Sequence, residues 1–566
     1  MEKSVTKALL MTALITNSLV VGAVTVFAEE SLTEYTLDTM VVTATRTEKR
    51  DVDVPASTEI ITYEDIVDSG SVNAMEAVSK MLGVDYNTYL PGGSAQTSMT
   101  NEINVRGFSY GTLILVNGNP INLNNTYVID AIPAEAIERI EVVKGGGSVL
   151  YGSEAQSGVI NIITKKKISN KVRAGFGNYK QQQYNVAVGD DKLKINYDLK
   201  KWGYVKEARY TAANTYTNLK ESSNENIGIG YNFNDQLSFE YNHLDTEVSY
   251  ESLKKGRLNS FTDSSNKQDL IQLNYNGNKT KSHAWFNKTK LDYAGSNARN
   301  LFENESFGAD LQQNIELNDK SLLTVGGVYK REVYNSKLKR GKPGIGKKAR
   351  NQMGLFAQLD YKFNDKDNVI IGGRGTWTSS ESNGQSYDNF STSAQYIHKF
   401  NQDKSFYISV AESFVMPSFK QMFPSSWVET KPNPDLKPQE GINYEMGYKE
   451  ISGNHAWKVA LFHMDVKDNI SATLNKDDTY EYNNQDFKNT GFEASLRVDA
   501  SEKFDYDLGL LVHNPKYKWD TDIRNGWHNK FGKYQITGGV GYKIDKFKAK
   551  LTGSYIGDRY SSPSTM

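Results

Sequence analysis

The sequence predicts a membrane β-barrel whose lumen holds an N-terminal α+β domain. Three observations support this prediction. From about residue 170 onward, apolar and polar residues alternate through one strand after another. Tyr, Trp and Phe gather at strand ends, and the connections alternate between short and long, as in outer-membrane barrels. The composition of the 566 residues, with 34 Tyr, 45 Gly and a mean hydropathy of -0.58, also suits strands better than membrane helices.

Charge and cysteine content exclude several other classes of protein. Lys and Arg number 66 against 67 Asp and Glu, so no global basic field attracts nucleic acid. Without cysteine there is no disulfide framework, thiolate zinc site or thiol nucleophile. The 7 His show no metal-ligand spacing, and no Ser/His/Asp or paired-carboxylate arrangement stands out. We therefore expect neither an enzyme nor a resident metal or cofactor.

The apolar run at the N-terminus is expected to be an export signal. Two lysines precede the apolar stretch from Ala8 to Val26. Val26-Phe27-Ala28 has the small-x-small pattern of a cleavage site and is followed by two glutamates, which argue against the alternative of a signal anchor. The expected order is a signal peptide over residues 1–28 and a periplasmic leader over residues 29–45.

A compact α+β domain is expected next, over residues 46–168. Short helices are predicted at Tyr63–Val67 and Ala74–Leu82, and strands at Ile114–Val116 and Arg139–Val143. Asn117-Gly118, which follows the first of these strands, predicts a tight turn.

The barrel is expected over residues 169–566. In one typical strand Met353, Leu355, Ala357, Leu359 and Tyr361 alternate with Gln352, Gly354, Gln358, Asp360 and Lys362. A soluble sandwich or a propeller would alternate as well. However, the polar faces carry Gly, Asn, Gln and charged groups throughout, as expected where a barrel interior is wet and its exterior meets lipid. Short connections such as Asn318-Asp319-Lys320 are then periplasmic, and long ones near residues 251–266, 335–350 and 414–440 are external.

The strand count predicts an open barrel wall. Alternating runs from Lys171 number about 19, the last being Phe547–Tyr560, whereas bacterial single-chain barrels have even strand counts. Missing strands would expose two sheet edges to lipid at several kcal/mol per unpaired backbone group. We therefore expect a truncated or fragmentary product, with a gap in the wall between the first strand near Lys171 and the last near Leu551. A complete barrel of about 18 or 20 strands is the alternative.

Several phrases in fixed order make the sequence resemble TonB-dependent outer-membrane receptors. D-T-M-V-V-T-A at Asp38–Ala44 looks like the TonB box. The plug-domain phrases are I-x-V-R-G-F at Ile103–Phe108, L-I-L-V-N-G at Leu113–Gly118, I-E-R-I-E-V-V-K-G at Ile137–Gly145 and L-Y-G-S-x-A-x-x-G-V-I-N-I-I-T at Leu150–Thr164; the barrel phrases are F-V-M-P at Phe414–Pro417 and N-P-D-L-K-P at Asn433–Pro438. The resemblance covers nearly the whole mature chain and is greatest to the cobalamin and colicin I receptor branch. Gly146, in place of the usual Pro, and Gln439, in place of the usual Glu, depart from the family pattern.

The resemblance implies active uptake of a scarce nutrient by a monomer embedded in outer-membrane lipid. The family barrel has 22 strands, with the plug domain inside the lumen. The TonB box, here Asp38, Thr39, Met40, Val41, Val42, Thr43 and Ala44, connects the receptor to the TonB–ExbB–ExbD energy-coupling complex. Lying just outside the plug, it can pair with that partner as an added strand. Four plug residues are expected to be structural, Arg106 through a plug-to-barrel salt bridge and Gly107, Gly118 and Gly152 as backbone positions.

One external loop bears on the ligand. Asn335 to Arg350 contains no acid and seven basic residues: Lys337, Lys339, Arg340, Lys342, Lys347, Lys348 and Arg350. Such a patch attracts an anionic solute and favours a ferric siderophore, with cobalamin as the second choice. Contact with lipopolysaccharide phosphates is the alternative role. Haem receptors of the family carry a His between the F-x-x-P and N-P-x-L phrases, and residues 418–432 contain none.

The plug apex is expected to supply the other ligand contacts. By position in the family these are Tyr86, Tyr89, Gln96, Asn124 and Tyr127. The rival class, a passive porin or adhesin built on the same barrel, has no plug and no coupling segment.

Overall fold

The computed structural model describes residues 40–87, 102–124, 126–212, 214–296, 299–339, 346–380, 385–423, 430–477, 479–520, 525–529, 532–545 and 547–559. The expected signal peptide and the leader up to residue 39 lie outside them. All described residues belong to one unit, Leu37–Met566. Among the described residues, no helix is both long and apolar enough to span a membrane.

A five-stranded mixed sheet forms the centre of the plug. Its order is β3 (Thr58–Thr62), β8 (Ile137–Lys144), β9 (Gly158–Thr164), β6 (Thr112–Val116) and β7 (Asn119–Pro120), with β6 and β9 parallel. Two smaller pairs flank it: β1 (Met40–Val41) with β2 (Lys49–Arg50), and β4 (Val84–Asn87) with β5 (Glu102–Val105). The turn at Asn117-Gly118 has positive φ at both residues, which Asn and Gly tolerate best.

Short helices complete the plug. They are α2 (Tyr63–Asp68), α3 (Ala74–Ser79), α4 (Ser148–Tyr151) and the 3-10 turns η1 (Asp51–Asp53) and η2 (Ala134–Ala136). Thr62 and Asp65 form a capping box at the start of α2, which explains why a helix begins there. The helices and strands predicted for this domain are all present.

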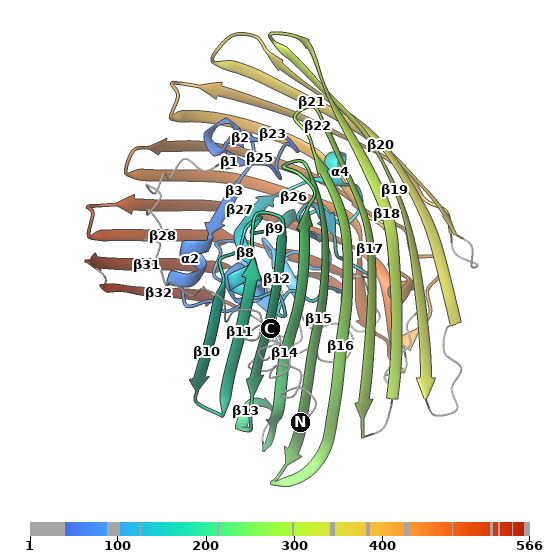
Figure 1. Cartoon of the computed structure of the whole chain (residues 1–566). Coiled ribbons are helices and arrows are strands. Elements are labelled where there is room, and N and C mark those ends of the chain that lie inside the picture. The colour runs from blue at the N-terminus through green and yellow to red at the C-terminus, as the bar shows by residue number, and fades with distance from the viewer. Residues whose placement is uncertain are drawn as a thin grey trace. The chain divides into compact units, whose positions relative to one another are not determined.

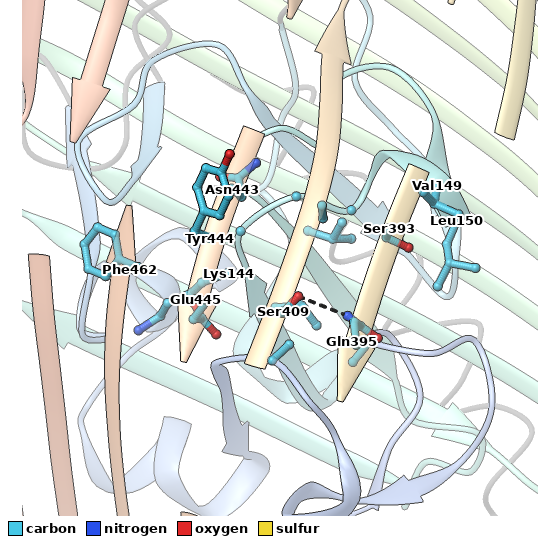
Figure 2. A pocket seen from close by; sticks show the side chains of 18 of the residues that line it. Lys144, Val149, Leu150, Ser393, Gln395, Ser409, Asn443, Tyr444, Glu445 and Phe462 are labelled. Atoms are coloured by element: carbon cyan, nitrogen blue, oxygen red, sulfur yellow. Dashed lines mark hydrogen bonds between the residues drawn. The ribbon is translucent and has the colours of Figure 1, made fainter. Parts of the chain in front are cut away.

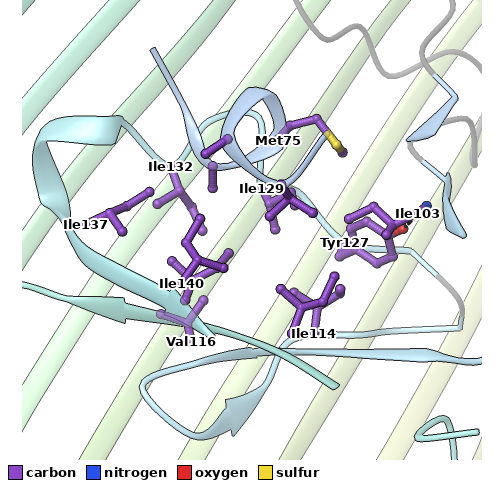
Figure 3. Close-up of a cluster of buried hydrophobic side chains, with 14 of the residues drawn as sticks. Met75, Ile103, Ile114, Val116, Tyr127, Ile129, Ile132, Ile137 and Ile140 are labelled. Carbon is purple, nitrogen blue, oxygen red and sulfur yellow. Dashed lines mark hydrogen bonds between the residues drawn. The ribbon is translucent and has the colours of Figure 1, made fainter. Parts of the chain in front are cut away.

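The plug core is apolar and continues onto the barrel wall. Figure 3 shows Met75 of α3 packing with Ile114, Ile129 and Ile140. Leu244 and Leu270, from two barrel strands, belong to the same buried cluster. Burial of aliphatic side chains therefore holds the plug against the wall as well as together.

The rest of the described chain forms one sheet of 23 strands that follow one another in chain order (Figure 1). They are β10 (Lys171–Gly177), β11 (Gln181–Gly189), β12 (Leu193–Trp202), β13 (Val205–Ala212), β14 (Thr215–Asn232), β15 (Leu237–Lys254), β16 (Arg257–Asn276), β17 (Thr280–Gly295), β18 (Arg299–Asn318), β19 (Ser321–Lys339), β20 (Gly346–Lys362), β21 (Asp367–Ser380), β22 (Asp388–Lys399), β23 (Lys404–Val415), β24 (Thr430–Lys431), β25 (Gln439–Ser452), β26 (His455–Leu474), β27 (Tyr480–Asp499), β28 (Phe504–His513), β29 (Lys516–Asp520), β30 (Asn525–Asn529), β31 (Tyr534–Ile544) and β32 (Phe547–Gly557).

The strand count agrees with the expected one. β13 continues β12 along β14, and β24, β29 and β30 are short loop strands, so 19 of the 23 strands cross the wall. Among the described pairings, none joins β10 to β32, and each of these strands pairs on one side only. The expected gap between Lys171 and Leu551 is thus observed. The interpretation of the chain as truncated stays a prediction.

The two faces of the wall differ as the alternation predicts. On β20, Met353 and Leu355 are about half exposed on the outer face, whereas Gln352 and Gln358 are buried against the interior. The structure therefore has an apolar exterior and a polar lumen, as a barrel in lipid requires.

Two external loops are shorter than expected. The region near residues 251–266 is a hairpin whose strands β15 and β16 continue to a turn at Lys255-Gly256. In the region 335–350, β19 continues to Lys339 and β20 begins at Gly346, so part of the predicted loop is sheet. The region 414–440 instead holds a one-turn helix, α5 (Phe419–Met422), and β24.

Candidate functional site

The predicted TonB box is folded against the plug. Its first two residues, Asp38 and Thr39, lie outside the described part of the chain. Met40–Val41 pairs with Lys49–Arg50, and the side chains of Val41 and Thr43 are completely or almost completely buried. In this state the segment expected just outside the plug is packed on it, because its own backbone and hydroxyl groups find partners on the plug.

One carboxylate holds the segment. Glu141 Oε2 accepts hydrogen bonds from Val42 N at 3.0 Å, Thr43 N at 2.9 Å and Thr43 Oγ1 at 2.6 Å. Tyr151 Oη donates to Thr43 O at 2.9 Å, and burial raises the pKa of Tyr151 to about 12. Glu141 lies on β8, the strand next to the plug edge, so the segment is attached directly to the plug sheet.

Ion pairs attach the plug to the wall at two deeply buried points. Arg106 Nη1 lies 2.6 Å from Glu445 Oε2, and its Nη2 lies 3.0 Å from Glu493 Oε2. Burial disfavours the charge of Arg106, but the two glutamates outweigh it and raise the pKa of the guanidinium. Arg106 therefore occupies the plug-to-barrel position that the sequence analysis assigned to it.

The second buried point lies around Asp51. Lys449 and Lys458, from β25 and β26, both contact its carboxylate. Burial alone would raise the pKa of Asp51, but the two ammonium groups hold it well below its usual range. Lys449 Nζ also donates to Val54 O at 3.0 Å, so this cation is fully partnered.

The three glycines predicted to be structural all adopt positive φ, and two of them touch the wall closely. A Cβ on Gly152 would lie 2.9 Å from Arg374 Nη2, and one on Gly118 would lie 2.9 Å from His283 Cε1. A Cβ on Gly107 would crowd Pro515 at 3.2 Å. Any larger residue at these positions is strained by both backbone conformation and contact.

An outer cavity lies between the plug apex, the wall and α5. It has about 350 Å³ of empty space, part of it open to solvent, and is lined by Asn124, Thr126, Asn266, Thr289, Leu291, Phe302, Asn304, Tyr334 and Lys420. Asn124 Nδ2 donates to Asn304 Oδ1 at 2.9 Å, and its Oδ1 accepts from Phe419 N at 3.1 Å. Asn124 thus joins the apex, the wall and α5 at the cavity.

The other predicted apex residues divide into three cases. The structure contradicts the expected ligand contact of Tyr127. Its ring belongs to the buried plug core and its hydroxyl accepts a hydrogen bond from Ile103 N at 2.7 Å, so it cannot contact a ligand in this state. Tyr86 is half-buried against the same core, and its carbonyl accepts from Arg559 Nη2 at 3.5 Å. Tyr89 and Gln96 lie outside the described residues.

The predicted basic loop is less uniform than its sequence. Lys337 Nζ pairs with Glu303 Oε2 at 3.0 Å, and Lys348 Nζ lies 4.6 Å from the ring centroid of Phe423. Lys347 is exposed. The structure contradicts the expected place of Arg350 in an external loop. This residue is buried and pairs with Glu332 Oε2 at 2.8 Å, because β20 carries it into the lumen. Arg340 and Lys342, like the side chain of Lys339, lie outside what the structure describes.

A second cavity separates the plug from the wall. It has about 760 Å³ of empty space, part of it open to solvent, and Figure 2 shows Val149 and Leu150 of the plug beside the wall strands that carry Ser393, Gln395 and Ser409. Gly146 reaches this interface: a Cβ there would lie 2.8 Å from Asn443 Nδ2. Glycine in place of the family proline therefore permits a close approach to β25.

A buried charge network was missed by sequence reasoning. Glu332 accepts from Lys330 at 2.7 Å and from Arg350, and the plug residue Glu154 faces all three. Glu154 is buried, its Oε2 has no hydrogen-bond partner among the described residues, and burial raises its pKa to about 7. These partners are far apart in sequence, so no local pattern joins them.

Comparison with known proteins gives matches over both parts of the chain. Residues 165–565 match the family "TonB dependent receptor-like, beta-barrel", and residues 50–159 match the family "TonB-dependent Receptor Plug Domain". The vitamin B12 transporter BtuB of Vibrio vulnificus (strain CMCP6) is 26% identical over 574 residues, covering 93% of this chain and 85% of that protein.

Solved structures share the fold at lower identity. A point mutant of the ferric enterobactin receptor PfeA of Pseudomonas aeruginosa has a TM-score of 0.68 and 15% identity, covering 92% of this chain and 87% of that chain. The siderophore receptor PirA of Acinetobacter baumannii has a TM-score of 0.65 and 18% identity, covering 88% of this chain and 85% of that chain.

Proposed function

Because this chain belongs to the family of TonB-dependent outer-membrane receptors, we propose that it imports a ferric siderophore across the outer membrane. The ligand enters at the outer cavity beside Asn124. Energy from the TonB–ExbB–ExbD complex enters the plug through Asp38–Ala44. The siderophore is released into the periplasm when the plug yields.

The cations at the outer cavity are the reason for proposing an anionic ferric siderophore as the ligand. Lys420 lines the cavity, exposed Lys347 lies at the outer end of β20, and Lys348 stands beside Phe423, which follows α5. Cations around a low-dielectric opening concentrate anionic solutes and raise their capture rate. Phe302 and Tyr334 add apolar and aromatic surface against which a chelate packs.

Cobalamin is the second candidate, and the 26% identity to a vitamin B12 transporter favours it. Cobalamin is not anionic, however, so it makes no use of the external lysines. A passive porin is disfavoured because plug side chains, Arg106 foremost, are paired with lumen residues.

Binding to purified full-length receptor tests the choice. Ferric enterobactin, cyanocobalamin and haemin are titrated against the receptor at low and high salt, with Trp fluorescence as the readout. We expect ferric enterobactin, the anionic probe, to bind and its capture to weaken as salt rises. Saturable binding of cyanocobalamin without binding of ferric enterobactin would show that cobalamin, and not a ferric siderophore, is the ligand.

A further inference from the structure

Arg374 on β21 carries a buried charge without an acidic partner. Its side chain is 1% exposed and faces the lumen. Nε donates to Thr376 Oγ1 at 3.0 Å, whereas Nη2 has no hydrogen-bond partner among the described residues. Within the same described set, no carboxylate lies within ion-pair distance of it. A buried cation without a counter-charge is costly, so a chain that keeps one has a use for it.

The space around this guanidinium is built by two glycines, one from each domain. Gly152, at the end of α4 in the plug, and Gly354 on β20 lie so close that a Cβ on either would come within 2.9 Å of Nη2. α4 packs against β21 and β22, near which it lies in Figure 1. The plug turn at Gly152 therefore covers Arg374, and its withdrawal uncovers the guanidinium.

A second arginine makes the local charge more positive. The Cζ atoms of Arg46 and Arg374 lie 5.3 and 6.0 Å from the ring centroid of Phe356. Asp310 pairs with Arg46 at 3.5 Å, and it also lies 3.6 Å from His283. Asp310 is thus the paired acid of Arg46, and among the described residues no ion pair joins Arg374 to a carboxylate.

Further cations lie outward along the same wall. Lys330 is level with Gln352 and Thr378, four residues along β21 from Arg374, a rise of about 13 Å. Arg350 is level with Ser380, six residues from Arg374, or about 20 Å. Lys330 and Arg350 share Glu332 as their paired acid, and the plug residue Glu154 faces all three. Cationic side chains therefore follow the lumen face of β19–β21 from the outer hairpin inward.

We propose that Arg374 is an internal anion-binding residue, which receives an anionic group of the ligand once the Gly152 turn of the plug withdraws. This inference rests on the proposed import of an anionic ferric siderophore. Arg374 is the inward step after Lys330 and Arg350, and a ligand held there has left the outer cavity without reaching the periplasm. The residue acts on import, not on the first capture.

Two variants and one matched control test this role in the full-length receptor. R374M removes the charge at similar length, and R374K keeps a charge. K449M is the control, because Lys449 is equally buried but fully partnered by Asp51, Val54 and Thr58. Surface binding and import of ferric enterobactin are measured in cells that contain the coupling complex. Plug release in urea is followed with a fluorophore on Val67→Cys, since the chain has no other cysteine.

We expect R374M to bind ferric enterobactin within twofold of the parent and to import it at least tenfold more slowly, with R374K intermediate. The urea midpoint of R374M stays equal or rises, because an uncompensated charge is lost, whereas that of K449M falls. Parental import by R374M, or a midpoint that falls as in K449M, would overturn the inference. If the parent neither binds nor imports ferric enterobactin, the siderophore proposal fails instead, and the urea midpoints alone then decide between an uncompensated cation and a structural one.

Discussion

Among single residues, Arg106 forms two buried ion pairs that hold the plug against the wall. Its guanidinium satisfies two buried glutamates from different strands, Glu445 and Glu493. R106M leaves the buried carboxylate of Glu445 without its ion-pair partner and Glu493 with Lys144 alone, and we expect it to weaken plug docking by about 3–5 kcal/mol. The urea midpoint of plug release measures this. R106K keeps the charge but loses the forked geometry, so its urea midpoint is expected to lie between those of the parent and R106M. A parental midpoint for R106M would contradict the role of Arg106 in plug docking.

Glu154 gives the plug a pH dependence. Burial raises its pKa to about 7 from the ordinary 4.5, so the docked plug binds a proton that the released plug does not. The stability that protonated Glu154 gives to the docked plug is complete below about pH 4.5 and is lost as the pH rises to about 7. Above that pH the free energy of docking no longer changes with this group, and the total loss is on the order of 1–3 kcal/mol. We expect E154Q to flatten this part of the profile of urea midpoint against pH.

The control for that prediction is E64Q, which alters an exposed plug acid and should keep the parental slope. A slope that is the same in the parent and in E154Q would show that other groups, and not the Glu154 network with Lys330, Glu332 and Arg350, set the pH response.

The sequence phrases predict that Arg106 forms a plug-to-barrel salt bridge, but not which wall residues it meets. Arg106 stands in a plug phrase next to Gly107, and the positive φ of both residues fixes the backbone that aims it at the wall. Tyr127 was assigned to the ligand by position, but its ring fills the plug core. Periodicity cannot distinguish an aromatic residue that packs inward from one that faces a ligand.

At the scale of elements, the coupling segment is held by Glu141. Hydrogen bonds to a charged acceptor contribute about 1.5–3 kcal/mol each, and Glu141 Oε2 accepts three from the segment. We expect E141Q to free the segment and to speed the reaction of a thiol reagent with Val41→Cys, which is buried when docked, by roughly tenfold or more.

E138Q is the matched control for that measurement. Glu138 lies on the same strand and pairs with Arg139 at the surface, so its loss should leave the reaction rate near the parental one. Equal thiol reactivity in E141Q and E138Q would mean that strand pairing with Lys49–Arg50, and not Glu141, holds the segment.

The outer hairpin of β19 and β20 governs capture. Replacing Lys347 and Lys348 together by Gln should slow the association of ferric enterobactin severalfold at low salt, and the difference should vanish at high salt. Stopped-flow fluorescence measures the rate. Lys254 and Lys255, exposed at the tip of the β15–β16 hairpin, serve as the control pair. Equal association rates for the two double variants would mean that Lys347 and Lys348 do not attract the ligand, and would favour their alternative role in contact with lipopolysaccharide.

The elements also show where loop prediction fails. The sequence predicts a long external loop near residues 335–350, yet β19 and β20 pair as far as Ser336 and Gly346. Backbone hydrogen bonds sustain a hairpin beyond the lipid, where no apolar face is needed to mark the strand. Only the strand portions that face lipid carry the alternating signal.

At the scale of the whole molecule, the fold was predictable because one physical rule repeats along the wall. Strands must hide every backbone group from lipid and present an apolar face to it, so 19 wall-crossing strands repeat the same alternation. Most of how the plug sits was not predictable, because it depends on single side chains such as Asp51 and Asn124 meeting wall residues that are distant in sequence.

We expect force applied to Asp38–Ala44 to move the plug and so to drive import. V42P removes the N–H that donates to Glu141 and that an added strand would need. The most direct measurement compares surface binding with energised accumulation of ferric enterobactin, and in parallel of cyanocobalamin, in cells expressing the parent or V42P. We expect V42P to bind both ligands as the parent does and to accumulate neither of them. Accumulation by V42P at the parental rate would contradict this expectation.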